Sequence, residues 1–187
     1  MKNILNSARA NMDFEIKEKD GIKYYLEKGV IQSIEPPASL FGFTYWSHMI
    51  PPYKPERVLM LGCGGHTIPK LIEKVWGKFD LTCNEKYDAK QILSDVAESH
   101  YKFDYIIVDL FSGAKMPEIV YDEKFIDNLQ TVAQKLVAIN TPIDTNVSYS
   151  YEHQNRFIHV ATRGTEDNAI MFFKCKGDNN SYRPQLP

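Results

Sequence analysis

Residues 57–85 read RVLMLGCGGHTIPKLIEKVWGKFDLTCNE, and this stretch decides which fold we expect. RVLMLG is a short apolar run between a proline and a glycine, which is typical of a parallel strand buried on both faces. The next segment places four apolar side chains, from Ile68 to Val75, at helical spacing, and Gly77 is suited to end the helix. KFDLTCNE predicts a second, weaker strand. A strand, a glycine turn, a helix and another strand are therefore expected in direct succession.

Strands and helices alternate through the rest of the chain. Residues 103–111, FDYIIVDLF, give the strongest strand signal, and residues 21–34 predict a hairpin around Lys28 and Gly29. The aromatic-rich residues 40–50 suit a buried helix or a passage from strand to helix. Further helices are expected near 87–100 and 122–134, and further strands at 135–140, 156–162 and 169–175. This alternation predicts an α/β fold with a largely parallel sheet.

Composition narrows the class of protein. The chain has 187 residues, 43% of them hydrophobic and 25% charged, with a formal net charge of -2. These values predict a globular protein with one main core and disfavour nucleic-acid binding by bulk charge. No apolar run reaches the length of a signal peptide or a membrane span. A break near Pro51 to Pro55 separates residues 1–50, a small N-terminal β element with a lead-in helix, from an α/β body at residues 51–187.

The three cysteines, Cys63, Cys83 and Cys175, are odd in number and widely spaced, without a CxxC pair. This pattern argues against a disulfide framework and against a structural zinc site, and it favours a reducing cytoplasm. Cys63 lies inside the glycine turn. It could be reactive near a helix N-terminus, although a small buried filler is the simpler interpretation.

The glycine turn at Gly62, Gly64 and Gly65 is suited to bind a ligand. Glycine lets a ligand approach the main chain closely, and the helix that follows presents free N–H groups. In doubly wound sheets the ligand lies at the carboxyl ends of the strands, where an acidic residue can hold a ribose; Glu85 has that place. The alternative is that the glycines only make a tight turn. Thr67 at the sixth position of the motif disfavours a dinucleotide.

Asp109 ends the strongest strand. Such a carboxylate often only marks the exit of a strand into water. Asp109 would lie beside the glycine turn, however, if the two strands are neighbours in the sheet, and there it could act as a general base or bind an amine. An NAD-linked dehydrogenase would need a longer glycine pattern, and a metal enzyme would need clustered ligands, whereas the five histidines are scattered.

With these residues in place, most of the chain resembles the spermidine synthase-like branch of the S-adenosylmethionine-dependent methyltransferase superfamily. The likeness rests on the linked order of an N-terminal β segment, a tyrosine-containing helix, a nucleoside-binding turn, a central strand and a C-terminal hairpin. These correspond to GIKYYLEKGVIQSI, FTYWSHMI, RVLMLGCGG, FDYIIVDLF and FIHVATRGTEDNAIMFF. The resemblance implies a Rossmann-like methyltransferase fold with a mostly parallel sheet, a C-terminal antiparallel hairpin and a small N-terminal β element.

The resemblance also implies roles for single residues. Glu85 would bind the ribose, and Asp88 would meet the adenine amine. Gly62, Gly64 and Gly65 would surround the methionine-like tail. Asp109 matches the catalytic aspartate, and Tyr45 matches a tyrosine of the substrate pocket. His48 could line the same pocket, although packing within an aromatic cluster is the favoured interpretation. Ser112 stands at a substrate-binding position where the family has a second aspartate.

Two departures from the family pattern bear on function. Only two residues separate Glu85 from Asp88, where the family has a helix and a strand, so an edge strand of the sheet is expected to be missing. Ser112 in place of the second aspartate removes a carboxylate that a polyamine would need, which disfavours true spermidine synthase activity.

Two functions remain open. The first is a transferase that binds S-adenosylmethionine or decarboxylated S-adenosylmethionine and passes a methyl or aminopropyl group to a small-molecule acceptor, with an amine as one candidate. The second is a trimmed, non-catalytic binding or assembly module. In either case we expect no metal, no nucleic acid and no membrane as partner. Because spermidine synthases pair with a second subunit, the resemblance makes a homodimer a candidate assembly.

Overall fold

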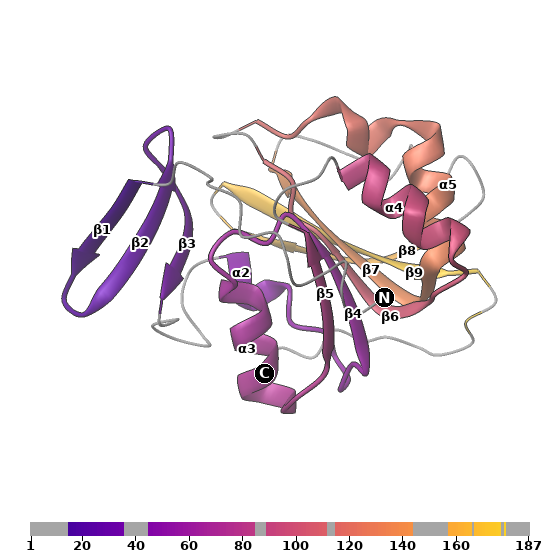
Figure 1. The fold of residues 1–187 in the computed structure, drawn as a ribbon, viewed down its shortest axis with the longest axis horizontal. Coiled ribbons are helices and arrows are strands. Elements are labelled where there is room, and N and C mark those ends of the chain that lie inside the picture. The colour runs from indigo at the N-terminus through magenta and orange to yellow at the C-terminus, as the bar shows by residue number, and fades with distance from the viewer. Residues whose placement is uncertain are drawn as a thin grey trace.

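A six-stranded sheet carries helices on both faces, and a separate three-stranded sheet lies beside it (Figure 1). The computed structural model describes residues 15–35, 45–84, 89–111, 115–143, 157–165, 167–176 and 178. The small sheet contains β1 (Glu15–Lys19), β2 (Ile22–Glu27) and β3 (Val30–Glu35). The large sheet contains β4 (Arg57–Leu61), β5 (Asp80–Asn84), β6 (Phe103–Val108), β7 (Ala133–Pro142), β8 (Phe157–Gly164) and β9 (Asn168–Cys175).

The helices lie in two layers. α2 (Tyr45–His48) and α3 (Thr67–Trp76) cover one face of the large sheet, and α4 (Ala89–Glu98) and α5 (Glu123–Val132) cover the other (Figure 1). A short 3-10 turn, η1 (Glu118–Tyr121), precedes α5. Asp122 caps α5, because its carboxylate accepts a hydrogen bond from the backbone N–H of Phe125 at 3.0 Å. No helix in these ranges is long and apolar enough to cross a membrane.

The strand order of the large sheet is β5-β4-β6-β7-β9-β8. β4 pairs in parallel with β5 and β6, and β6 pairs in parallel with β7. β9 runs antiparallel to both β7 and β8. The predicted α/β fold, with a mostly parallel sheet and a C-terminal antiparallel hairpin, is therefore confirmed. Within the described residues β5 forms one outer edge of the sheet.

The central strands are buried on both faces, which explains why they read as continuous apolar runs. In β4, Val58 and Met60 pack with α2 and α3, whereas Leu59 and Leu61 pack with α4 and α5. None of the four is more than 1% exposed. The same alternation continues in β6 and β7. Two apolar layers thus hold the carboxyl ends of the parallel strands in place, where polar side chains can gather.

The small sheet confirms the predicted hairpin and adds an unpredicted strand. Lys28 and Gly29 both have positive φ, 51° and 81°, and they connect β2 to β3. A two-residue turn with two positive φ values matches the twist of antiparallel strands. β1, EIKEK, was not predicted: all five of its residues are exposed, so it shows no alternation of apolar and polar side chains.

The hydroxyl of Thr67 joins the small sheet to the start of α3. It donates a hydrogen bond to the carbonyl oxygen of Ile34 at 2.9 Å, and it accepts one from the backbone N–H of Ile34 at 2.9 Å. Its oxygen also lies 2.5 Å from the Ser33 hydroxyl. Glu35 forms an ion pair with Lys70 on α3. These bonds place β3 against the segment that leads out of the glycine turn.

The predicted division into residues 1–50 and 51–187 stays a prediction. Trp46, Met49 and Ile50, which precede the proline-rich break, pack in the same apolar cluster as Val58 and Leu71. The lead-in helix α2 is therefore part of the packing around the large sheet.

Candidate functional site

The carboxyl ends of β4 and β6 bring Gly62 and Asp109 together. Leu61 lies opposite Val108 in the sheet, and the backbone N–H of Asp109 donates to the carbonyl of Leu61 at 2.8 Å. Gly62 has a φ of 86°, and a Cβ there would lie 2.0 Å from the backbone oxygen of Asp109. Only glycine permits this approach. β4 and β6 are thus neighbours, which was the condition for Asp109 to lie beside the glycine turn.

Hydrogen bonds from two neighbouring elements hold the Asp109 carboxylate. Tyr45, the first residue of α2, donates its hydroxyl to Oδ2 at 3.1 Å. Asn140 on β7 donates its side-chain N–H to Oδ1 at 2.8 Å. Asn168, the first residue of β9, in turn donates to the side-chain oxygen of Asn140 at 3.0 Å. The structure therefore brings together Tyr45 and Asp109, two of the predicted site residues, and adds Asn140 and Asn168.

The environment of Asp109 favours reversible protonation near neutral pH. Burial raises the pKa of its carboxyl from 3.8 to about 6, against the lowering effect of the bonds from Asn140 and Tyr45. A carboxylate with such a pKa is ionised at pH 7 and can still accept a proton. Burial and the charge of Asp109 raise the pKa of Tyr45 well above 10, so Tyr45 stays a neutral hydroxyl donor.

Hydrogen bonds from the large sheet fix α2, and with it the position of Tyr45. The hydroxyl of Tyr105 on β6 donates to the carbonyl of Met49 at 2.5 Å. Arg163 on β8 donates to the carbonyl of His48 at 3.0 Å. His48 lies at the other end of α2 from Tyr45, half-buried, and burial together with Arg163 lowers its pKa. The Tyr45 hydroxyl is thus attached to a short helix that is anchored at its far end.

The second half of the glycine turn faces β3. A Cβ on Gly65 would lie 2.5 Å from the Ser33 hydroxyl oxygen, and a Cβ on Gly64 would lie 3.4 Å from the carbonyl of Gln32. The absence of a side chain at Gly65 is therefore required for packing against the small sheet. Gly64 has a φ of 47°, which glycine adopts easily.

Three predicted site residues, Glu85, Asp88 and Ser112, lie outside the described residues. Glu85 directly follows Asn84, the last residue of β5, which lies opposite Leu61 in the sheet. Its position in the chain is thus one residue beyond the carboxyl end of the edge strand. Its assignment to the ribose stays a prediction, as do the roles of Asp88 and Ser112.

Cys63 and Cys83 form a disulfide, so the expectation that the cysteines would not pair is wrong for these two. Their Cα atoms are 6.1 Å apart, within the range that a disulfide spans. Cys83 lies opposite Met60 in the sheet, and Cys63 follows the end of β4 by two residues, after the turn at Gly62. Sequence spacing could not show this, because the pairing depends on strand register. Cys175 is free and buried. Disulfides are rare in a reducing cytosol, so this bond does not support the expected cytoplasmic location. That location stays a prediction.

Removing the disulfide should destabilise the fold. The two cysteines are 20 residues apart in sequence, and closing a loop of that length is expected to contribute about 3 kcal/mol. We expect Cys83→Ser to lower the free energy of unfolding by about this amount, as measured by urea denaturation without reductant. Cys175→Ser, which leaves the disulfide intact, is the control. Equal stability of Cys83→Ser and the unmodified chain would contradict the contribution of the disulfide.

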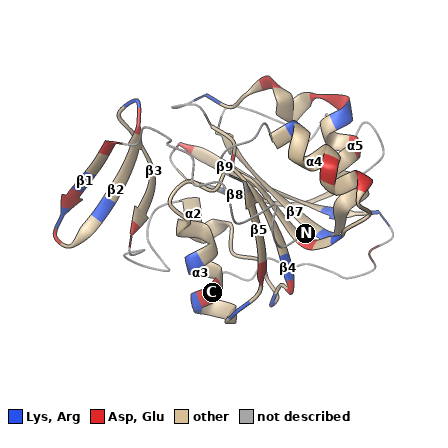
Figure 2. Cartoon of the chain, viewed as in Figure 1, with Lys and Arg blue, Asp and Glu red and all other residues tan. Residues whose placement is uncertain are grey.

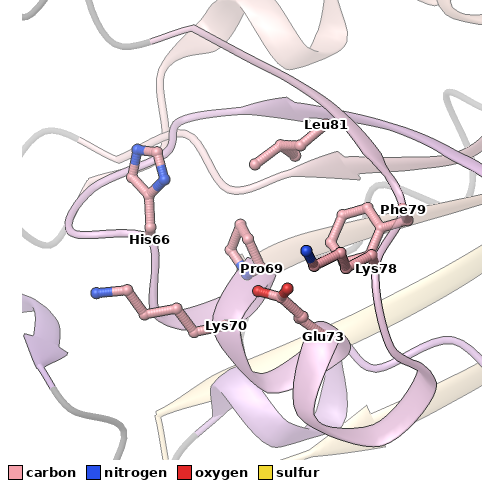
Figure 3. Close-up of a pocket in the computed structure, with 7 residues that line it drawn as sticks. All are labelled: His66, Pro69, Lys70, Glu73, Lys78, Phe79 and Leu81. Carbon is pink, nitrogen blue, oxygen red and sulfur yellow. The ribbon is translucent and has the colours of Figure 1, made fainter.

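A hollow of about 360 Å³ lies outside the site, between α3 and the β5 edge (Figure 3). Its lining combines cationic, acidic and apolar side chains: His66, Pro69, Lys70, Glu73, Lys78, Phe79 and Leu81. It lies on the flank of α3 beside the open sheet edge. Neither Asp109 nor Tyr45 lines it. Within the described ranges no three His, Cys, Asp or Glu side chains gather in a way that could hold a metal ion.

Comparison with solved structures places this arrangement in a known fold. A "probable spermidine synthase" from Corynebacterium glutamicum aligns with a TM-score of 0.60 and 17% identity, over 86% of this chain and 76% of that one. A "putative methyltransferase complexed with SAH" aligns at 0.52 and 12% identity, over 89% and 57%. A "putative sam-dependent methyltransferase" from Streptococcus mutans aligns at 0.50 and 11% identity, over 86% and 55%.

The chain has a Rossmann-like methyltransferase fold. It spans somewhat more than half the length of the two methyltransferases. At these identities the likeness concerns the fold alone. No protein-family model matches the chain, and no curated protein matches it. Within this fold, Gly62 and Asp109 lie side by side at the carboxyl ends of the neighbouring strands β4 and β6.

Two residues of the polar cluster, Asn140 and Asn168, were not predicted from the sequence. Asn140 closes the predicted strand KLVAIN, so a polar residue at a strand's carboxyl end was a usable signal. Asn168 begins β9, which runs antiparallel to β7, and the spacing of residues along the chain does not give the register between them.

Proposed function

We propose that this chain binds S-adenosylmethionine or its decarboxylated form and transfers a methyl or aminopropyl group to a small acceptor, with Asp109 as the base. The observation that carries this proposal is the Asp109 carboxylate, held by Tyr45 and Asn140 beside the glycine at the end of β4. Its raised pKa, about 6, suits a group that takes a proton from an amine or hydroxyl acceptor.

The described residues fit one end of such a ligand. Gly62 places no side chain over the end of β4, and both groups shown to bond the Asp109 carboxylate are neutral donors, so they leave its charge in place. A carboxylate of this kind attracts a cationic sulfonium or ammonium group. Glu85, one residue beyond β5, would hold the ribose hydroxyls. When bound, the nucleoside supplies an electrophilic carbon next to a sulfonium.

The remaining work falls to residues of this chain. Displacement at carbon needs the acceptor in line with the leaving group and water kept away. Asp109 would orient the acceptor and take its proton, and Tyr45 would hold the carboxylate in one orientation through its hydroxyl. The absent second carboxylate, replaced by Ser112, favours an acceptor with fewer positive charges than a polyamine.

Two observations favour the second candidate function, a non-catalytic binding module. Ser33 fills the space above Gly65, and β5 is the sheet edge within the described residues, where the family has a further strand. Both features reduce the surface available to a nucleoside. Residues of both signs occur on the small sheet, on α3 and on the α4–α5 layer, which supports neither a nucleic acid nor a membrane surface as partner (Figure 2).

Isothermal calorimetry separates the two functions. The transferase should bind S-adenosylmethionine, its decarboxylated form or methylthioadenosine with micromolar affinity, and Glu85→Ala should weaken that binding about tenfold or more, because charged hydrogen bonds to the ribose are lost. Asp80→Ala, at the opposite end of β5, is the matched control and should bind normally. No heat with any of the three ligands would leave the binding module as the function.

A further inference from the structure

We propose that Asn140 and Asn168 are positioning residues that orient and polarise the Asp109 carboxylate, with Asn168 fixing the orientation of the Asn140 amide. The inference rests on the proposed function for its catalytic meaning. The arrangement itself rests on two hydrogen bonds, from Asn168 to Asn140 and from Asn140 to Asp109.

The chain of bonds gives the Asn140 side chain one favoured orientation. A carboxamide can present either its oxygen or its N–H₂ group to a neighbour. Asn168 donates to the oxygen of Asn140 at 3.0 Å, so the N–H₂ group is directed to Asp109, 2.8 Å away. Asn140 is 1% exposed, and water therefore cannot easily replace either bond. The sheet sets the geometry, since Asn140 lies opposite Ile170 and Asn168 lies opposite Pro142.

The bond from Asn140 opposes the effect of burial on Asp109. Burial favours the neutral carboxyl, whereas a donor aimed at the oxygen favours the carboxylate, and the bond from Asn140 lowers the pKa of Asp109. Among the described residues, Tyr45 from α2 and Asn140 from β7 donate to the carboxylate. Gly62 from β4 approaches the Asp109 main chain and brings no charge. Tyr45 is the titratable group of these, and it stays neutral. Asn140 therefore helps to keep Asp109 ionised at neutral pH.

Asn140→Leu tests this role, because leucine keeps the size of the side chain and removes the donor. We expect the pKa of Asp109 to rise by about one unit above its wild-type value, measured by NMR titration of the Asp109 carboxyl carbon in the chain of 187 residues. The acidic limb of the kcat/KM profile for methyl transfer should move by the same amount. A residue that only supports the fold would leave both positions unchanged.

A second variant and a control complete the experiment. Asn168→Leu, at a less buried position, should raise the pKa of Asp109 in the same direction by a smaller amount, since the Asn140 amide then loses its orienting donor. Asn128→Leu on α5 is the matched control: Asn128 is 5% exposed, and its side-chain nitrogen has no hydrogen-bond partner in the described residues. It should leave the Asp109 pKa unchanged.

The outcomes are distinct from those that test the transferase. If Asn140→Leu folds and the Asp109 pKa stays constant or falls, the role of Asn140 is refuted. If Asn140→Leu does not fold, Asn168→Leu decides, and an unchanged pKa there refutes the proposal. The NMR titration needs no substrate, so it gives its answer even when the chain binds none of the three nucleosides.

Discussion

Asp109→Asn is expected to lower the rate of group transfer by about 10²- to 10⁴-fold, the usual contribution of a positioned base. Asparagine keeps the size of the side chain and cannot accept the acceptor's proton. The rate should be measured with S-adenosylmethionine, its decarboxylated form and a panel of small amines, at several pH values. In the wild-type chain the rate should increase as the pH rises through about 6, where Asp109 ionises. The variant should lack this dependence.

Binding and stability provide the controls for Asp109→Asn. The variant should bind methylthioadenosine like the wild type, because the proposed ribose contact at Glu85 is unchanged. The folded pKa of Asp109, about 6, is above its ordinary 3.8, so its contribution to stability is fully present below pH 4 and is lost as the pH rises through 6. Between pH 4 and 7 the wild type should lose up to about 3 kcal/mol relative to the variant. Full transfer activity in Asp109→Asn would remove Asp109 as the base.

The sequence predicted the parts of the fold whose residues are buried on both faces. β4 and β6 were recognised because Val58, Leu59 and Ile107 leave no polar face. β1 was missed for the opposite reason, since its five side chains are exposed and no alternation distinguishes it from a loop. The local pattern of apolar and polar residues therefore predicted the parallel strands of the core, and it did not predict β1, the exposed strand of the small sheet.

The candidate site was predictable where it depends on strand ends and unpredictable where it depends on register. Gly62 and Asp109 each follow a strongly apolar strand, so strand adjacency alone brings them together. Asn168 reaches Asn140 only because β9 returns antiparallel beside β7 in one register. The pairing of Cys63 with Cys83 likewise needs the offset between β4 and β5. Such offsets arise from packing of the whole sheet, which residue spacing does not encode.

Gly62→Ala is expected to lower the free energy of unfolding by about 4 kcal/mol or more, from positive-φ strain and overpacking together. The new Cβ would lie 2.0 Å from the Asp109 backbone oxygen and 2.7 Å from its carbonyl carbon. Backbone cannot rotate away as a flexible side chain can, so the ends of β4 and β6 would have to separate. Denaturation in urea, monitored by circular dichroism, measures the change.

Gly29→Ala separates the clash from the conformational strain. Gly29 has a φ of 81°, close to the 86° of Gly62, and a Cβ there would meet no atom within 4 Å. We expect it to cost about 1 kcal/mol, the strain alone. If the two substitutions lower the free energy of unfolding equally, then Gly62 is needed only for its positive φ. The close approach to Asp109 would then make no contribution to stability. A larger loss at Gly62, accompanied by weaker nucleoside binding, would show that the same contact supports both the sheet and the position of the carboxylate.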